Sequence, residues 1–209
     1  MKNLDTTLYF ITDSTGFSEE EFLCRVEAAL KGGITLLQLR EKNKTTREYI
    51  SLAEKVHNLT KKYNVPLIID DRTDVAMAVD AEGVHLGQSD MPVNIARRIL
   101  GDNKIIGATA KTAPQAVEAF RNGADYLGVG AIFPTTTKVK TVLTSVDTLI
   151  DIVKSVPVPV NAIGGLNKDN IDILKNTGIA GVCVVSAIMK SGNPQKSAEE
   201  IKERFSGLK

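Results

Sequence analysis

The chain has 209 residues, of which 43% are hydrophobic and 24% are charged, and this is enough to bury one sizeable core. Its 26 lysine and arginine side chains nearly balance 25 aspartate and glutamate side chains, which leaves a formal net charge of +1. No global field would therefore hold nucleic acid or an anionic membrane, and we expect neither partner. Any anion must be bound by a local cluster of cations.

The apolar runs and the two cysteines indicate where in the cell the protein resides. No run approaches the roughly 18 apolar residues that a membrane helix needs, and the first residues lack the apolar run of a secretory signal. Cys24 and Cys183 both stand in apolar surroundings, which is typical of buried thiols in a reducing compartment. We therefore expect a cytoplasmic protein.

Eight short apolar, β-branched runs recur from end to end of the chain. Stretches with helical spacing lie between successive runs, as in Phe22, Val26, Ala29 and Leu30. This alternation predicts parallel strands joined by right-handed helical crossovers. At about 26 residues per unit, the chain is long enough for a compact (β/α)8 TIM barrel, expected as one domain over residues 1–209. The runs cover residues 8–12, 34–39, 66–69, 83–86, 104–109, 125–129, 158–163 and 179–185.

An open doubly wound sheet is the rival architecture. That fold carries Gly-x-Gly-x-x-Gly directly after its first strand when it binds a dinucleotide. Here the first expected strand runs into Thr-Asp-Ser-Thr-Gly at residues 12–16. The absence of the motif favours the barrel.

Three polar side chains alternate with leucines at the end of the second expected strand. The period of two places Gln38, Arg40 and Lys42 on one side and Leu39 on the other. In a (β/α)8 barrel the active site is assembled at the carboxyl ends of the strands. A planar guanidinium and a mobile ammonium at that end suit a polyanion such as diphosphate. The alternative is a solvated strand end with loose charges.

Carboxylates follow the next two expected strands. Asp70 and Asp71 follow the third strand, and Asp90 lies in the loop after the fourth. Neighbouring carboxylates of this kind can share a Mg²⁺ ion whose shell is completed by substrate phosphates, so Asp71 and Asp90 are the expected ligands of one ion per site. Helix capping is the alternative role, and we expect it to explain one of the three. No His or Cys cluster has the spacing of a zinc site.

The later strand ends supply hydroxyls and glycines. Thr109 ends the fifth expected strand. The loop of residues 128–141 is rich in hydroxyl-bearing and basic side chains, and we expect it to form a lid with Lys138 facing the diphosphate. The alternative is a surface loop that binds no ligand. Gly165 and Ser186 follow the seventh and eighth strands, where barrels often bind a monophosphate through backbone N–H groups.

Neither the histidines nor the cysteines indicate acid–base or nucleophilic chemistry. His57 lies within an expected helix and His85 within the fourth expected strand, and we interpret both as packing residues. With no obvious general base, metal and cations would instead stabilise charge on a leaving group. The residues thus predict transfer of a group from a diphosphate ester to a phosphorylated partner.

Seven motifs follow one another in order along nearly the whole chain. They are Gln-Leu-Arg-Glu-Lys (38–42), Ile-Ile-Asp-Asp-Arg (68–72), Gly-Val-His-Leu-Gly-Gln-Ser-Asp (83–90), Gly-Ala-Asp-Tyr-Leu-Gly-Val-Gly (123–130), Phe-Pro-Thr-Thr-Thr-Lys (133–138), Ala-Ile-Gly-Gly (162–165) and Val-Val-Ser-Ala-Ile (184–188). Together they resemble the thiamine phosphate synthase family.

The resemblance implies an activity and a set of site residues. A hydroxymethylpyrimidine group would pass from its diphosphate to the ring nitrogen of a thiazole phosphate, with or without a carboxylate, giving thiamine phosphate and diphosphate. Diphosphate would leave first, and the thiazole would capture the pyrimidine-methyl cation. Motif by motif, the implied residues are Gln38, Leu39, Arg40, Glu41, Lys42, Asp70, Thr109 and Lys138 for the pyrimidine diphosphate, Asp71 and Asp90 for Mg²⁺, and Thr135, Thr136, Thr137, Gly165, Val185 and Ser186 for the thiazole phosphate. Among them, Arg40, Lys42 and Lys138 would assist catalysis.

Departures from the family pattern keep alternatives open. Asp70 stands where the family usually has Asn, and Thr109 stands where it usually has Ser. A thiazole tautomerase of the same barrel family would use a histidine in the loop after the fifth strand, but residues 109–112 read Thr-Ala-Lys-Thr. A catalytically weak paralogue that binds phosphate ligands is a further alternative because of Asp70. The sequence is compatible with a homo-oligomer and does not fix the oligomeric state.

Overall fold

The computed structural model describes residues 4–135 and 142–208, and it shows a closed barrel of eight parallel strands in the order β1 to β8, with β8 pairing with β1. The strands are β1 Leu8–Ile11, β2 Leu36–Leu39, β3 Leu67–Asp70, β4 Gly83–Leu86, β5 Ile105–Ala110, β6 Tyr126–Gly130, β7 Val160–Ile163 and β8 Gly181–Val184. Each lies in one of the eight expected runs, apart from one or two residues at its ends. The predicted (β/α)8 barrel is confirmed.

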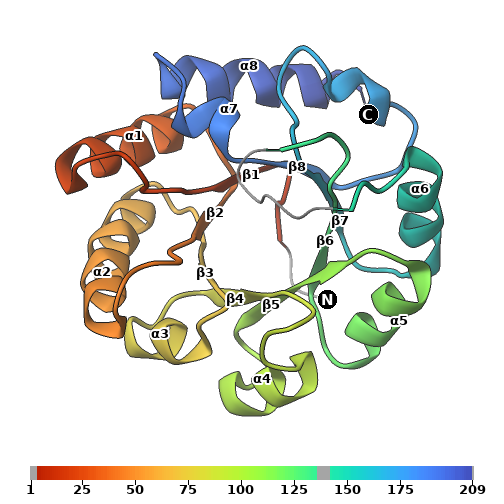
Figure 1. Ribbon diagram of the computed structural model, residues 1–209, viewed down its shortest axis with the longest axis horizontal. Coiled ribbons are helices and arrows are strands. Elements are labelled where there is room, and N and C mark those ends of the chain that lie inside the picture. Colours follow the sequence, from red (N-terminus) through yellow and green to blue (C-terminus); the bar gives the residue numbers. More distant parts are fainter. Residues whose placement is uncertain (1–3, 136–141, 209) are drawn as a thin grey trace.

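Helices form a ring outside the strands (Figure 1). They are α1 Glu19–Lys31, α2 Thr46–Lys62, α3 Thr73–Ala78, α4 Val93–Leu100, α5 Ala113–Arg121, α6 Val146–Ser155, α7 Ser186–Met189 and α8 Pro194–Ser206, with a 3-10 turn, η1 Ile171–Leu174, between β7 and β8. Local sequence explains their starts. At α1, for example, the Ser18 hydroxyl accepts a hydrogen bond from the Glu21 amide, and the predicted stripe from Phe22 to Leu30 is buried.

Two apolar clusters hold the fold together. The larger one fills the layer between strands and helices. The smaller one fills the barrel interior with inward side chains, which include Tyr9, Ile68, Tyr126 and Cys183. Tyr126 fits because Gly107 on the neighbouring strand has no side chain. A Cβ atom there would lie 2.1 Å from the tyrosine Cζ. The interior below the strand ends is therefore packed, and the buried hydroxyls of Tyr9 and Tyr126 hydrogen-bond each other within it.

The cysteines differ from each other in burial. Cys183 lies inside the barrel, where desolvation raises the pKa of its thiol. Cys24 is exposed on α1, so its predicted burial is wrong. Its sequence neighbours Phe22 and Val26 are buried, but residue 24 faces away from the apolar stripe they form. No helix of the described residues combines the length and hydropathy that crossing a membrane would require.

Candidate active site

A cavity of about 490 Å³ lies at the carboxyl ends of the strands. Residues from all eight strands or from the loops that follow them contribute to its wall, as expected for a barrel active site. Eleven predicted site residues line it, namely Gln38, Arg40, Lys42, Asp70, Asp71, Asp90, Thr109, Thr135, Gly165, Val185 and Ser186. The structure thus brings together most of the predicted site.

The remaining predicted residues fall into two groups. Thr136, Thr137 and Lys138 lie outside the described residues. Leu39 and Glu41 are described but do not line the cavity. Strand alternation turns Leu39 toward the helix layer, where it is fully buried, and the Glu41 carboxylate accepts a hydrogen bond of 2.8 Å from the Ser14 hydroxyl in the loop after β1. Their predicted contact with substrate therefore has no support in this geometry.

Lys42 joins two carboxylates at one end of the cavity. Its Nζ lies 2.7 Å from a carboxylate oxygen of Asp70 and also bonds Asp71, while Arg40 Nε lies 3.8 Å from Asp70. Desolvation lowers the pKa of Lys42, but the two adjacent carboxylates outweigh it and the net pKa is raised. The ammonium thus stays charged within the cavity wall.

The three aspartates have different proton affinities. Desolvation and the nearby charge of Asp71 raise the pKa of Asp70 to about 6, against the opposing effect of Lys42 and Arg40. Asp71 and Asp90 contact each other through their carboxyl groups. Desolvation and this contact raise the pKa of Asp90, while for Asp71 hydrogen bonds with Lys42 and Asp90 overcome desolvation and lower the pKa. The two carboxyl groups therefore titrate as an interacting pair.

Capping does not account for these aspartates. The first turns of α3 and α4 have no side-chain cap, although Asp70, Asp71 and Asp90 precede them. Asp90 instead accepts a hydrogen bond of 2.7 Å from the Gly87 amide within its own loop. The expectation that capping explains one of the three is wrong. All three carboxylates line the cavity.

The opposite side of the barrel supplies a different wall. The loops after β7 and β8 bring Gly164, Gly165, Val185 and Ser186 to the cavity, and Thr135 joins them from the loop after β6. β7 and β8 lie across the ring from β3 and β4 (Figure 1). A Cβ atom at Gly164 would lie 2.4 Å from the Ala131 Cβ, and one at Gly165 would lie 2.7 Å from the Pro134 carbonyl oxygen, so both glycines allow this wall to pack against the loop after β6. The wall can present backbone N–H groups to an anion while the aspartates stand on the other side.

Sequence reasoning missed several residues of the wall. Lys111 lines the cavity two positions beyond Thr109, so it continues the inward alternation of β5 and adds a cation. Tyr9 and His85 also line the cavity. His85 Nε2 lies 3.0 Å from the Thr109 hydroxyl, and Nδ1 lies 3.1 Å from the Tyr126 hydroxyl. Its predicted role as a plain packing residue is incomplete, and the period of two within β4 was the available signal.

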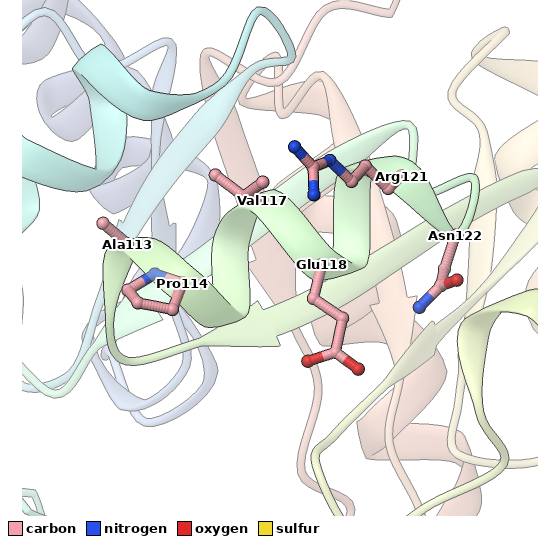
Figure 2. A pocket seen from close by; sticks show the side chains of 6 residues that line it. All are labelled: Ala113, Pro114, Val117, Glu118, Arg121 and Asn122. Carbon is pink, nitrogen blue, oxygen red and sulfur yellow. The ribbon is translucent and has the colours of Figure 1, made fainter.

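A second hollow, on the outer face of α5, lacks such convergence. The side chains of Glu118 and Arg121 point to opposite sides of the helix (Figure 2). The hollow is lined by Ala113, Pro114, Val117, Glu118, Arg121 and Asn122, which all belong to α5 or follow it directly. The cavity at the strand ends therefore remains the candidate active site.

A (β/α)8 barrel whose mouth combines cations, paired carboxylates and a glycine-rich wall defines an enzyme for phosphorylated substrates. Comparison with known proteins narrows this class. Residues 8–188 match the sequence model of the family described as thiamine monophosphate synthase, and the chain belongs to this family.

Individual relatives agree with this assignment. The chain is 48% identical over 200 residues to thiamine-phosphate synthase of Clostridium tetani, covering 96% of both chains. It is 54% identical over 184 residues to thiamine-phosphate synthase 2 of Streptococcus pneumoniae strain TIGR4, covering 88% of both. The solved structure of thiamine phosphate pyrophosphorylase from Pyrococcus furiosus is 41% identical, with a TM-score of 0.89 over 98% of this chain and 97% of that one. These relatives identify the chain as a transferase of thiamine biosynthesis.

Proposed function

We propose that the cavity transfers the pyrimidine-methyl group of hydroxymethylpyrimidine diphosphate to thiazole phosphate and releases diphosphate. The observation that carries this assignment is the division of one cavity into two walls. Lys42, Asp70 and Asp71 stand on one side, and Gly165 and Ser186 stand on the other. Two phosphorylated substrates that must meet need two anion sites within one enclosure, and a volume of about 490 Å³ suits a small-molecule site.

The cationic wall would bind the diphosphate. Arg40 offers a rigid fork of donors and Lys42 a flexible ammonium, and Lys111 adds a third cation within the described residues. Lys42 is held by Asp70 and Asp71 before a ligand enters, so its ammonium already stands in the cavity wall, where it would stabilise the negative charge that grows as the C–O bond breaks. This favours departure of diphosphate without a protein nucleophile. Lys138 would strengthen the same wall.

The carboxyl groups of Asp71 and Asp90 fit a divalent cation. They are hard oxygen donors in mutual contact, and a cation between them would offset the repulsion of two ionised carboxylates. Among the described residues no group of three or more His, Cys, Asp or Glu side chains could hold a metal ion. The two carboxylates would therefore share the coordination of the cation with phosphate oxygens of the substrate. When bound, Mg²⁺ would neutralise charge on the diphosphate.

The glycine-rich wall would hold the acceptor. Gly165, Val185 and Ser186 can present backbone N–H groups and one hydroxyl to a monophosphate, and Thr135 can add another hydroxyl, with Thr136 and Thr137 as further donors. The thiazole nitrogen would then face the carbon that diphosphate leaves. Binding on the second wall orients the acceptor and excludes water from the cation.

Magnesium titration of the Asp71→Asn and Asp90→Asn variants tests this proposal. Each substitution keeps the shape of the side chain but removes a metal-binding charge. We expect thiamine phosphate formation to fall at least about a hundredfold at fixed Mg²⁺, with partial recovery at higher Mg²⁺ and an unchanged far-UV circular dichroism spectrum. Asp74→Asn, an exposed carboxylate on α3 that pairs with Arg72, is the matched control. Near-normal turnover in both site variants at every Mg²⁺ concentration would contradict the metal assignment.

A further inference from the structure

A continuous hydrogen-bonded chain of side chains crosses the barrel beneath the cavity. Gln38 Nε2 lies 2.6 Å from the Tyr9 hydroxyl, which lies 2.7 Å from the Tyr126 hydroxyl. Tyr126 lies 3.1 Å from His85 Nδ1, and His85 Nε2 lies 3.0 Å from the Thr109 hydroxyl. Gln38 and Thr109, at the two ends, are expected to touch the pyrimidine substrate. Tyr126 is fully buried and does not line the cavity.

The chemistry of the donors sets one direction along this chain. Gln38 Nε2 can only donate, so the Tyr9 hydroxyl accepts from it and must give its own proton to Tyr126. Tyr126 has then accepted one bond, and its proton goes to its remaining partner, His85 Nδ1. A ring nitrogen that accepts carries no hydrogen, so the imidazole proton lies on Nε2 and is donated to Thr109. Each buried tyrosine hydroxyl in this series of hydrogen bonds thereby donates once.

We propose that this directional chain, with His85 as its positioning residue, sets which hydrogen-bonding groups the cavity offers to the pyrimidine ring. At one end the Gln38 amide oxygen is left as an acceptor, and at the other end the Thr109 hydroxyl proton is left as a donor. This pair complements a heteroaromatic ring that presents an amino group toward β2 and an acceptor toward β5. The inference rests on the proposed function, because that function supplies an aminopyrimidine.

The chain also makes its two ends interdependent. If the Gln38 amide turned over, Tyr9 would donate to it and each following bond would reverse, so that Thr109 would donate to His85 rather than to a ligand. The cavity can therefore offer an acceptor at Gln38 together with a donor at Thr109, or the reverse pair. Tyr126 carries this dependence although it is not exposed to the cavity.

Nitrogen NMR of the histidine rings tests the direction without any assay of activity. The protein has two histidines. His57 is an internal reference because its Nδ1 lies 3.0 Å from the Val79 carbonyl, which can only accept a hydrogen bond. In protein labelled with ¹⁵N histidine, we expect His85 to show a protonated Nε2 and a bare Nδ1. The Tyr126→Phe variant should give a mixture of both tautomers at His85 and an unchanged His57. A protonated Nδ1 in wild-type protein, or no response to Tyr126→Phe, would overturn the inference.

A control tyrosine separates this effect from a general loss of a buried hydrogen bond. The Tyr49 hydroxyl is also buried and donates to the Leu39 carbonyl at 2.6 Å, outside the chain. Tyr49→Phe should leave the His85 ring signals as they are in wild-type protein. If Tyr49→Phe changed the tautomer as much as Tyr126→Phe does, the proposed path would be wrong.

Steady-state kinetics test whether the chain reaches the substrate. We expect Tyr126→Phe to raise KM for the pyrimidine diphosphate about three- to tenfold, the effect of about one hydrogen bond, with a smaller change in kcat. In a Thr109→Val background the same substitution should have little further effect, because the donor it orients is gone. Additive effects would contradict the coupling. Absence of any thiamine phosphate in wild-type protein would contradict the proposed function, whereas the NMR result would still decide the direction of the chain.

Discussion

Replacing Asp70 by asparagine should stabilise the protein at neutral pH, although it removes an ion pair. The Asp70 carboxyl is 8% exposed, and desolvation with the charge of Asp71 raises its pKa from the ordinary value of 3.8 to about 6. Each pH unit between the two values corresponds to about 1.4 kcal/mol. Ionised Asp70 therefore costs the folded state up to about 3 kcal/mol relative to the unfolded chain. Asparagine has nearly the same shape and never carries this charge.

The sign of the effect follows from the raised pKa. Below 3.8 the carboxyl is protonated in both states and the cost is absent. The cost grows as pH rises from 3.8, and it is complete above about 6. Urea unfolding of wild type and Asp70→Asn, in EDTA, should therefore show a variant that is more stable by about 2 to 3 kcal/mol near neutral pH, with the difference vanishing toward about pH 4.

Asp80→Asn is the control, because the pKa of Asp80 is shifted in the opposite direction. Asp80 is exposed, and its ion pair with Lys104 lowers its pKa. Its variant should gain no stability at any pH. A gain for Asp70→Asn that did not change with pH, or a loss of stability at neutral pH, would refute the argument that desolvation dominates at Asp70.

Two further outcomes test the packing. Gly107→Ala should lower the free energy of unfolding by about 1 to 3 kcal/mol, because the new Cβ would lie 2.1 Å from the Tyr126 ring. The control is Gly192→Ala, whose new Cβ meets no atom within 4 Å, and it should change the free energy of unfolding by no more than about 0.5 kcal/mol. Equal effects of the two substitutions in urea unfolding would contradict the steric argument. A thiol reagent should label Cys24 in native protein and Cys183 only after unfolding, because one is exposed and the other is buried with a raised pKa. Native labelling that survives Cys24→Ser would show that the barrel interior is accessible.

The fold was predictable because it repeats. Each apolar run followed by a helical stretch gives the same signal, and eight repetitions leave few architectures besides a closed barrel. Alternation also predicted the inward direction of Gln38, Arg40 and Lys42. The same alternation turns Leu39 and Glu41 away from the cavity, although both belong to the continuous family motif of residues 38–42.

Side-chain contacts between different strands could not be predicted from the sequence. Lys42 and Asp71 are 29 positions apart, and which of three aspartates a lysine bonds depends on the register of neighbouring strands. His85 shows the same limit. A single histidine in an apolar strand indicates packing, and only the closed barrel places its ring between Tyr126 and Thr109.

Reconstitution of the reaction tests the central claim most directly. Purified protein would be incubated with Mg²⁺, hydroxymethylpyrimidine diphosphate and thiazole phosphate, with each component omitted in turn, and the products would be separated and quantified. The account predicts thiamine phosphate and diphosphate in equal amounts, only in the complete mixture, and little of either with Lys42→Met. Tight binding of both substrates without product, or isomerisation of the thiazole alone, would contradict it.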